Sequence, residues 1–356
     1  MPQDTAFTLP FGAATSPDAD AARQRSLHWC RRQRLVEDPV DELRLLHWDF
    51  AGLMAGWNPR ASGEQLDLTV DAVVVAALLN DHIDDHIDDH VHGPLAGPLP
   101  DRPDRIAALC AELGTVIATA GRPPAAAGPL VRAFADVWRR LADGASPGWL
   151  EHTGQHWQWY LGAHLQEARH RARHHAHHPA RRRVPTRAEY AELRRRSGPV
   201  PAMIDLSQKA YGFELPRRLA TDVVVRRMLD LTADVVGALG DVHSVERDES
   251  RGDLHNLVPV IEHELNCGRA EALQEIQSMI TSWCEEFLLL EARLPDTVGH
   301  RDAPAARRIA DCLRTAMSGY LEWNRTTRYH SLLVPAGDDH IGPPDHPRLW
   351  WGHTPS

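Results

Sequence analysis

Residues 70–90 read VDAVVVAALLNDHIDDHIDDH. The first ten of them, Val70 to Leu79, contain a single polar side chain, Asp71. A run this apolar exceeds what a surface helix of a globular protein carries, so we expect a buried helix that ends in acidic side chains. Few segments of the chain alternate apolar and polar residues as strands do, so the sequence predicts an all-α fold. Other stretches repeat apolar residues three and four apart: Asp41–Leu53, Asp104–Ala120, Ala127–Leu141, Leu219–Leu239 and Ala270–Leu294.

The acidic end of this stretch has the residue types of a divalent-metal site. Continued as a helix at about 100° per residue, it places Asn80, Asp84 and Asp88 within a sector of roughly 80°, with Asp81 near the edge. Like charges one turn apart repel, so a positive partner should compensate them. Carboxylate oxygens suit Mg²⁺, which proteins commonly hold with one or two carboxylates, water and substrate phosphates. We therefore interpret this helix end as a magnesium site.

Two other interpretations of the acidic stretch stay open at this point. One is a solvated acidic helix end without a ligand. The other uses His82, His86 and His90, which form a stripe at i, i+4 and i+8 that suits Zn²⁺ or Fe²⁺. A separate segment rich in His and Arg, residues 169–183, offers a surface to a metal or an anionic partner. We interpret it as a solvated loop between helices, because its histidines follow no defined ligand spacing.

The composition excludes several classes of protein. Lys and Arg number 39 against 49 Asp and Glu, so the net charge is −10, whereas a general nucleic-acid binder needs a basic face. The longest apolar run, Ala72–Leu79, is far shorter than the ~20 residues that span a bilayer. The five cysteines are widely spaced and form no CxxC pair, which is typical of reduced thiols. We expect a cytoplasmic protein with no nucleic-acid partner and no membrane span.

A second polar cluster follows the apolar helical stretch at residues 223–239. Gly240, Ser244 and Asp248 are four residues apart and share one helix face, with Asp241 beside them. A hydroxyl and a carboxylate one turn apart can complete a second Mg²⁺ site. The alternative for this cluster alone is an ordinary surface helix end.

Two cationic segments could neutralise a bound anion. Residues 193–199 read LRRRSGP, so three arginines, Arg194–Arg196, end a helical stretch and Gly198 with Pro199 breaks it. Such a break leaves free backbone groups that suit a polar ligand. Arg328 and Tyr329 stand together near the end, and guanidinium forks match phosphate oxygens in geometry. Taken alone, each segment is equally explained as a solvated surface feature. Together with two acidic helix faces, they suggest a metal-bridged diphosphate.

As a set, these segments resemble the bacterial class I terpene synthases, and the resemblance runs from Leu9 to Tyr329. Each segment is modestly specific, but their order along the chain is strongly specific. The segments are Asp71 with Asn80-Asp81-x-x-Asp84, Glu167–Arg171, Pro185–Arg194, Ser197-Gly198, Gly240–Asp248 with Arg251–Leu257, and Arg328-Tyr329. The resemblance implies an α-helical bundle around a deep apolar cavity. It also implies a lyase that ionises a C15 or C20 isoprenyl diphosphate and cyclises the carbocation to a terpene hydrocarbon or alcohol.

The chain departs from the family pattern at three positions. Asn80 stands where the aspartate-rich motif begins with Asp, Gly240 stands where the second motif has a metal-binding Asn, and Asp248 stands where that motif usually has Glu. Residues 84–88, Asp-Asp-His-Ile-Asp, give an intact DDxxD motif one turn later, so two registers of the first cluster stay open. We expect the neighbouring acids to compensate: Asp84 or Asp88 for Asn80 in the first cluster, and Asp241, the residue after Gly240, for the missing ligand of the second.

The resemblance assigns roles to individual residues. Arg194 would sense the diphosphate, Ser197 and Gly198 would follow as linker and effector with the Gly198 backbone presented to the substrate, and Arg328 and Tyr329 would clamp the diphosphate on closure. The cofactor would be three Mg²⁺ ions, with Mn²⁺ as a substitute. The implied metal ligands are drawn from Asn80, Asp81, Asp84, Asp85, Asp88, Asp241, Ser244 and Asp248.

The substrate-facing wall carries a hypothesis about chain length. Only 6% of the residues are aromatic, and Val73 and Ala77 stand where the family commonly places aromatic residues before the acids. We therefore expect an aliphatic, wide cavity that accepts geranylgeranyl diphosphate (C20) as readily as farnesyl diphosphate (C15). Two rival functions remain: a helical metal-binding or partner-binding homologue with little cyclase activity, and a chain-elongating prenyltransferase, which should carry two aspartate-rich motifs.

The positions of Pro and Gly residues along the chain indicate its domain organisation. We expect a flexible N-terminal segment at residues 1–19, one terpene synthase α-domain at residues 20–333, and a flexible tail rich in Pro, Gly and His at residues 334–356. The sequence leaves open whether the protein is a monomer or a homodimer.

Overall fold

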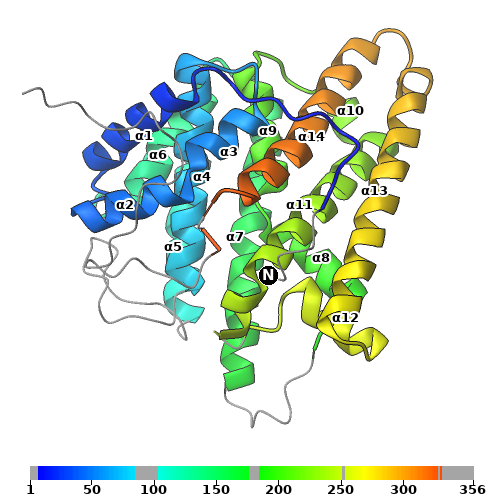
Figure 1. Cartoon of the computed structure of the whole chain (residues 1–356). Helices are drawn as coiled ribbons and strands as arrows, with labels where there is room; N and C mark the ends of the chain where they lie inside the picture. The colour runs from blue at the N-terminus through cyan, green and yellow to red at the C-terminus, as the bar shows by residue number, and fades with distance from the viewer. Residues whose placement is uncertain (1–6, 85–102, 176–183, 251–252, 328, 331–356) are drawn as a thin grey trace, which may run out of the picture.

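The computed structural model describes residues 7–84, 103–175, 184–250, 253–327 and 329–330, with the side chains of residues 82–84 and 170–175 left out. Within these residues it contains helices and no strand, which confirms the predicted all-α fold (Figure 1). The helices are α1 (Ala19–Gln33), α2 (Pro39–Trp48), α3 (Phe50–Trp57), α4 (Gly63–Asp84), α5 (Pro103–Ala118), α6 (Pro129–Ala142), α7 (Pro147–His175), α8 (Arg187–Ser197), α9 (Val200–Ala210), α10 (Arg217–Ala220), α11 (Val223–Ser250), α12 (Leu257–Leu265), α13 (Arg269–Val298) and α14 (Ala303–Asn324).

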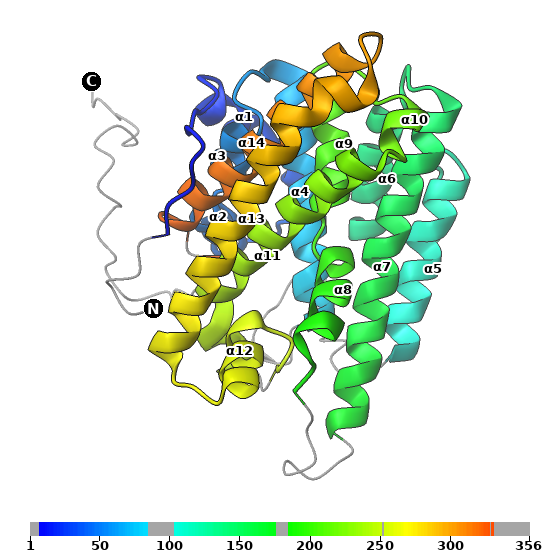
Figure 2. The ribbon, with the colours of Figure 1, turned by 90° about the vertical axis from the view of Figure 1, so that its right-hand side faces the viewer.

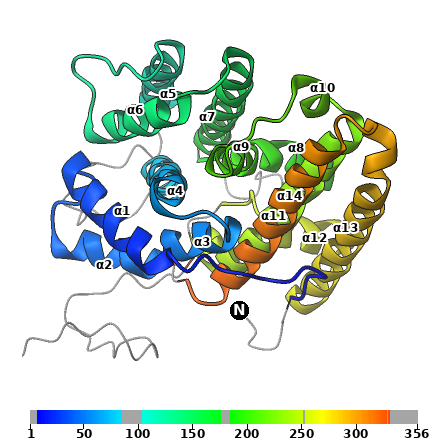
Figure 3. The ribbon, with the colours of Figure 1, turned by 90° about the horizontal axis from the view of Figure 1, so that it is seen from above.

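Two long helices organise the bundle. Helix α4 packs against α1, α3, α6, α7 and α9, and the view from above shows it enclosed by these neighbours (Figure 3). Helix α11 packs against α8, α9, α12, α13 and α14. Figure 2 shows α5, α6 and α7 side by side on one flank and α13 on the opposite flank. Because α9 packs on both α4 and α11 and α14 packs on α3, α9 and α11, the two halves enclose a common interior.

The apolar stretch that ends in acids forms α4, as predicted. Every residue from Val70 to Ala77 is buried, and so is Leu79. The burial of nearly all faces of these turns explains why their apolar residues follow no amphipathic period. Across the part of the chain that the structure describes, no helix has the length and apolar character needed to cross a membrane.

One buried charge anchors α4 to its neighbours. Asp71 is 2% exposed; its carboxylate accepts hydrogen bonds from Ser26 Oγ of α1 (2.8 Å) and from Arg140 Nη2 of α6 (2.8 Å). Burial raises the pKa of Asp71 to about 7, although Arg140 and Ser26 oppose the rise. The one polar side chain of the apolar run therefore ties three helices together on the side that faces α1 and α6.

Helices α3 and α14 cross with their backbones in contact. A Cβ atom added to Gly56 would lie 3.1 Å from Gly319 Cα, and one added to Gly319 would lie 2.5 Å from Trp57 N. Only glycine at both positions allows so close a crossing. This contact sets the spacing of two helices that carry aromatic side chains, described below.

Helix α8 is fixed at both ends by local sequence. Thr186 and Glu189 form a capping box at its start: Glu189 N donates to Thr186 Oγ (3.3 Å), and Thr186 N donates to Glu189 Oε2 (2.9 Å). The helix ends at Ser197; Gly198 and Pro199 follow, and α9 begins at Val200. This break places the last turn of α8 at the interior between α4 and α11.

Candidate active site

A cavity of about 180 Å³ lies between α3, α4, α7, α8, α9, α11 and α14. Its inner wall is mostly apolar and includes Met54, Val73, Ala77, Met203 and Val236. Its polar part includes residues of both acidic clusters and of the end of α8. The cavity thus combines an apolar interior with a polar region, as the sequence predicted.

Both predicted clusters contribute to the wall of this cavity, the first through Asn80 and the second through Asp241, Ser244 and Asp248. Asn80 near the end of α4 and Ser244 and Asp248 on α11 all contribute to its wall. Tyr329 also lines it, and its hydroxyl lies 3.4 Å from Asp81 Oδ1. The structure therefore brings together residues that are more than 150 positions apart in the sequence, around a space that a ligand could enter.

Several predicted residues lie outside the described part of the chain. These are the side chain of Asp84, all of Asp85 and Asp88, and Arg328. His86, His90 and most of the His-rich segment at 169–183 also lie outside it. The choice between the two registers of the first cluster therefore stays a prediction, as does the clamp role of Arg328.

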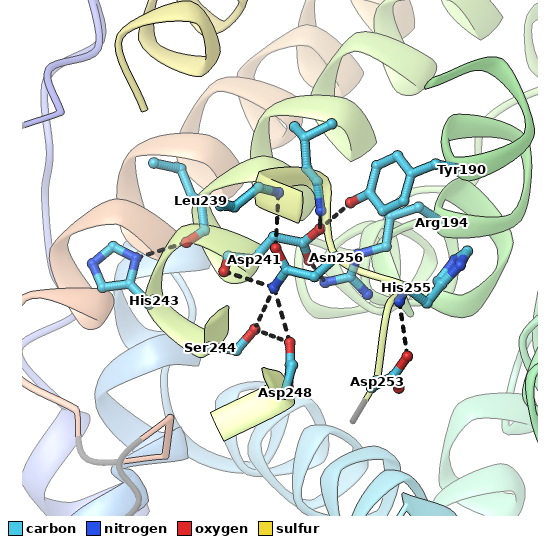
Figure 4. Close-up of polar contacts among 12 residues, drawn as sticks. Tyr190, Arg194, Leu239, Asp241, His243, Ser244, Asp248, Asp253, His255 and Asn256 are labelled. Carbon is cyan, nitrogen blue, oxygen red and sulfur yellow. Dashed lines mark hydrogen bonds and ion pairs between the residues drawn. The ribbon is translucent and has the colours of Figure 1, made fainter. Parts of the chain in front are cut away.

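Ser244 and Asp248 form a hydrogen-bonded oxygen pair (Figure 4). Ser244 Oγ donates to Asp248 Oδ2 at 2.6 Å, and Asn256 Nδ2 donates to the same oxygen at 2.9 Å. Asn256 is 1% exposed; its Oδ1 accepts from Val258 N (2.9 Å) and caps α12. The cap of one helix therefore orients the carboxylate of another.

The chemistry of this pair fits a divalent metal. A hydroxyl and a carboxylate one turn apart are hard oxygen donors, which Mg²⁺ prefers. Gly240, one turn earlier on the same face, offers no side-chain donor. Among the described residues, no three His, Cys, Asp or Glu side chains gather as a metal-binding group.

Asp241 has partners that differ from the prediction that it replaces the missing metal ligand. Its Oδ1 pairs with Arg194 Nη2 at 2.9 Å, and its Oδ2 accepts hydrogen bonds from Tyr190 Oη and from Leu257 N (2.7 Å). Burial raises the pKa of Asp241, and the Arg194 charge opposes that rise. Because both oxygens are already engaged, Asp241 is better explained as the support of Arg194 than as a metal ligand.

The end of α8 presents polar atoms to the cavity. Arg194, Ser197 and Gly198 all line it. Arg194 Nε and Ser197 Oγ are buried, and within the described residues neither atom has a hydrogen-bond partner. Buried polar atoms are nearly always paired, so these two are suited to a ligand, and the positive guanidinium favours an anion.

On α7, Glu167 was part of the family resemblance, whereas the sequence did not single out its neighbours Tyr160 and His164. His164 is 1% exposed and lines the cavity; its Nδ1 lies 3.4 Å from Glu167 Oε2. Glu167 Oε1 lies 3.6 Å from His255 Nε2. Tyr160 stands one turn before His164 and its hydroxyl donates to Ala76 O of α4 (2.9 Å). The spacing of residues 160, 164 and 167 marks one helix face, which was the available signal.

Aromatic rings enter the cavity from helices that the sequence did not single out. The α4 wall is aliphatic at Val73 and Ala77, as predicted. The prediction of an aliphatic cavity is wrong for the cavity as a whole, since aromatic side chains also line it. The low aromatic content of the whole chain does not determine where the aromatic side chains lie. Its aromatic residues are Phe50, Trp57, Tyr160, Tyr320, Trp323 and Tyr329, from α3, α7, α14 and the segment after α14.

Comparison with known proteins places these features in a family. Residues 78–286 match the family model described as terpene synthase family 2, C-terminal metal binding. The chain is 32% identical over 324 residues to 7-epi-alpha-eudesmol synthase ((2E,6E)-farnesyl diphosphate cyclizing) of Streptomyces viridochromogenes, covering 91% of this chain and 89% of that protein. It is 29% identical to pentalenene synthase of Streptomyces exfoliatus over 343 residues, covering 94% of this chain and 96% of that protein.

Solved structures agree with the sequence matches. The crystal structure of a-eudesmol synthase superimposes with a TM-score of 0.78 at 30% identity and covers 91% of this chain and 99% of that chain. Linalool/nerolidol synthase from Streptomyces clavuligerus in complex with 2-fluorogeranyl diphosphate gives a TM-score of 0.74 at 28% identity and covers 91% of this chain and 100% of that chain.

Proposed function

Since this chain belongs to the bacterial class I terpene synthases, which are lyases that act on isoprenyl diphosphates, we propose that it cyclises farnesyl diphosphate to a C15 terpene hydrocarbon or alcohol. The observation that carries the proposal is the pair of partnerless polar atoms, Arg194 Nε and Ser197 Oγ, beside the oxygen pair of Ser244 and Asp248 at one cavity. A relative named for farnesyl diphosphate supports C15. The small side chains of Val73 and Ala77 in the cavity wall favour C20 as the alternative.

The proposed metal ligands stand on two helices. Ser244 and Asp248 of α11, together with Asn80 and Asp81 of α4, would hold divalent cations, which we propose to be three Mg²⁺ ions with Mn²⁺ as a substitute. When bound, such ions supply positive charge that stabilises a departing diphosphate. Asp84, Asp85 and Asp88 remain proposed ligands of the first cluster.

The chain's own cationic groups act on the same leaving group. Arg194 Nε and Ser197 Oγ donate to diphosphate oxygens, and the pairing of Arg194 with Asp241 (2.9 Å) holds the guanidinium in place before the substrate arrives. Donors that are oriented in advance stabilise the developing charge without reorganisation, so the allylic C–O bond ionises. Gly198 follows at the end of α8, where its backbone faces the cavity.

The apolar wall controls the carbocation. Once the C–O bond has broken, the electron pair leaves with the diphosphate and the allylic cation is held among apolar and aromatic side chains. Aromatic faces such as those of Trp57 and Tyr320 stabilise a cation by about 0.5–2 kcal/mol each. Exclusion of water matters because premature capture would end the cyclisation.

The segment after α14 covers the polar side of the cavity. Arg247 of α11 lies over the ring of Tyr329 (5.3 Å to its centroid), and Arg247 Nη1 donates to Tyr329 O at 3.1 Å. The Tyr329 hydroxyl in turn contacts Asp81 (3.4 Å). We propose that Tyr329, with Arg328, closes over the diphosphate and links the two acidic clusters.

The test is product analysis with the purified full-length chain. Incubation with geranyl, farnesyl or geranylgeranyl diphosphate and Mg²⁺, followed by gas chromatography and mass spectrometry, should yield a cyclic C15 product from farnesyl diphosphate that disappears with a chelator. Comparable cyclic products from the C15 and C20 substrates would support the wide-cavity alternative. Release of only linear alcohols, or no turnover of any substrate, would refute the cyclase assignment for this chain.

A further inference from the structure

Gly240 occupies a buried position in the middle of α11, where glycine is unfavourable for a helix. Gly costs about 1 kcal/mol relative to Ala in a helix interior, so its presence calls for a packing reason. An ideal Cβ atom at this position would lie 2.8 Å from Tyr320 Oη and 3.4 Å from Arg194 Nη2. The space next to Gly240 is therefore already filled by a hydroxyl from α14 and a guanidinium from α8.

Arg194 lies across α11 on the face that this glycine leaves open. A Cβ atom added to Gly237, one turn earlier, would lie 3.4 Å from Arg194 Cγ, which is ordinary van der Waals contact. Beyond Gly240, the guanidinium reaches Asp241 on the next position of the helix (2.9 Å). The Arg194 side chain therefore runs along α11, past Gly237 and Gly240, to Asp241.

Tyr320 occupies the same space next to Gly240 with its hydroxyl. It belongs to α14, lines the cavity, and its ring packs on Trp323 with 5.4 Å between centroids. Burial raises the pKa of Tyr320, so its hydroxyl keeps its proton at neutral pH. Its Cζ would lie 3.7 Å from a Cβ at Gly240, so the hydroxyl oxygen alone accounts for the severe overlap.

From this juxtaposition we propose that Gly240 and Tyr320 are positioning residues for Arg194: the tyrosine occupies the place of the metal-binding side chain that the family carries at position 240. The pair confines the guanidinium at the wall of the cavity, where its Nε has no hydrogen-bond partner among the described residues. The second metal cluster then has Ser244 and Asp248 as its ligands, and the lost ligand is exchanged for a fixed positive group. This inference rests on the proposed function in that the anion bound by Arg194 is a diphosphate.

The experiment is a double-mutant cycle read out by binding rather than turnover. The affinity of the full chain for inorganic pyrophosphate in the presence of Mg²⁺ is measured by isothermal titration calorimetry for wild type, Gly240→Ala, Tyr320→Phe and the double variant. Gly240→Ala should weaken the affinity at least about tenfold in the wild-type background, since displacing a charged hydrogen-bond donor costs roughly 1.5–3 kcal/mol. In the Tyr320→Phe background the same change should cost less than about threefold, because the overlapping oxygen is gone.

Controls separate positioning from folding. Gly114→Ala on α5, where an added Cβ atom meets nothing within 4 Å, should leave both pyrophosphate affinity and activity unchanged. If Gly240→Ala alone fails to fold, the inference is supported when the double variant folds and binds like Tyr320→Phe, and it is overturned when the double variant also fails to fold. An equal cost of Gly240→Ala in both backgrounds overturns it as well. A wild-type chain without affinity for pyrophosphate refutes the proposed function and the inference together.

Discussion

At the scale of single residues, Arg194 neutralises a buried carboxylate of the fold and is also a proposed ligand of the diphosphate. Its guanidinium pairs with the buried Asp241, and Arg194 lines the cavity with its Nε left without a hydrogen-bond partner among the described residues. Arg194→Ala should lower kcat/KM by about 10²–10³, the usual loss when one electrostatic donor to a transition state is removed. Steady-state kinetics with farnesyl diphosphate measures this.

A neighbouring arginine provides the matched control for that prediction. Arg196 is exposed, lies on the same helix, and pairs with Glu192 at 3.2 Å. Arg196→Ala should stay within about threefold of wild type, because exposed ion pairs contribute little. Equal losses in both variants would mean that the charge of α8 as a whole, and not the position of Arg194, supports catalysis.

Asn256 has two functions that one substitution can separate. Its oxygen caps α12, and its amide nitrogen donates to Asp248 at 2.9 Å. Asn256→Ala should lose both functions, including about 1 kcal/mol of stability from the cap. Asn256→Ser should keep most of the cap but lose the support of Asp248, so the stability is largely retained while Mg²⁺ affinity in the presence of pyrophosphate falls. Denaturant unfolding and calorimetric titration measure the two effects; parallel behaviour of the two variants would contradict the separation.

At the scale of helices, the anchor of α4 makes stability depend on pH. Burial raises the pKa of Asp71 to about 7 from an ordinary value of 3.8. The stability that its protonated form provides is complete below the unfolded pKa near 4, and it is lost as the pH rises through about 7. Asp71→Asn does not titrate, so its free energy of unfolding should increase relative to wild type between pH 5 and pH 8.

Urea unfolding at several pH values measures this relative change. The slope of the difference should reach at most about 1.4 kcal/mol per pH unit, the value for one proton. Other carboxylates contribute equally to both proteins and cancel. A difference between the two proteins that does not vary with pH would show that Asp71 titrates in the folded state as an ordinary carboxyl does.

The positions of the helices could be predicted from the sequence better than the contacts between them. The run from Val70 to Leu79 identifies a buried helix because its composition allows no solvent-exposed face. The role of Asp241 was not accessible in this way, because its partners come from α8 and from the start of α12. Periodicity tells which residues share a face of one helix, but it does not tell which helix lies opposite.

The same limit applies to the wall of the cavity. The family pattern pointed to Val73 and Ala77, which do line it. The overlap of Gly240 with Tyr320 depends on the crossing of α11 and α14 at a distance of 80 residues in the chain, and no spacing in the sequence encodes that crossing.

At the scale of the whole molecule, the proposed metal ligands are divided between α4 and α11. A ligand that joins the two helices should stabilise the fold by mass action, by about 2.7 kcal/mol at a hundredfold excess over its Kd. We expect the melting temperature to rise by a few degrees with Mg²⁺ and pyrophosphate together. Either component alone should have a smaller effect, because neither links the two clusters. Differential scanning fluorimetry measures the shift, and an equal shift with Mg²⁺ alone would contradict the bridged arrangement.

The contact between Gly56 and Gly319 has a practical consequence for engineering new products. Phe50 and Trp57 stand on α3 and Tyr320 and Trp323 on α14, so the crossing point of these helices sets how far apart their rings stand. Any larger residue at Gly56 or Gly319 would force the two helices apart. Most members of a mutant library that varies either position would therefore be lost before their products could be screened. Substitutions are better placed on the part of the cavity wall that α4 forms, where small side chains leave room for larger residues that change the shape of the cavity.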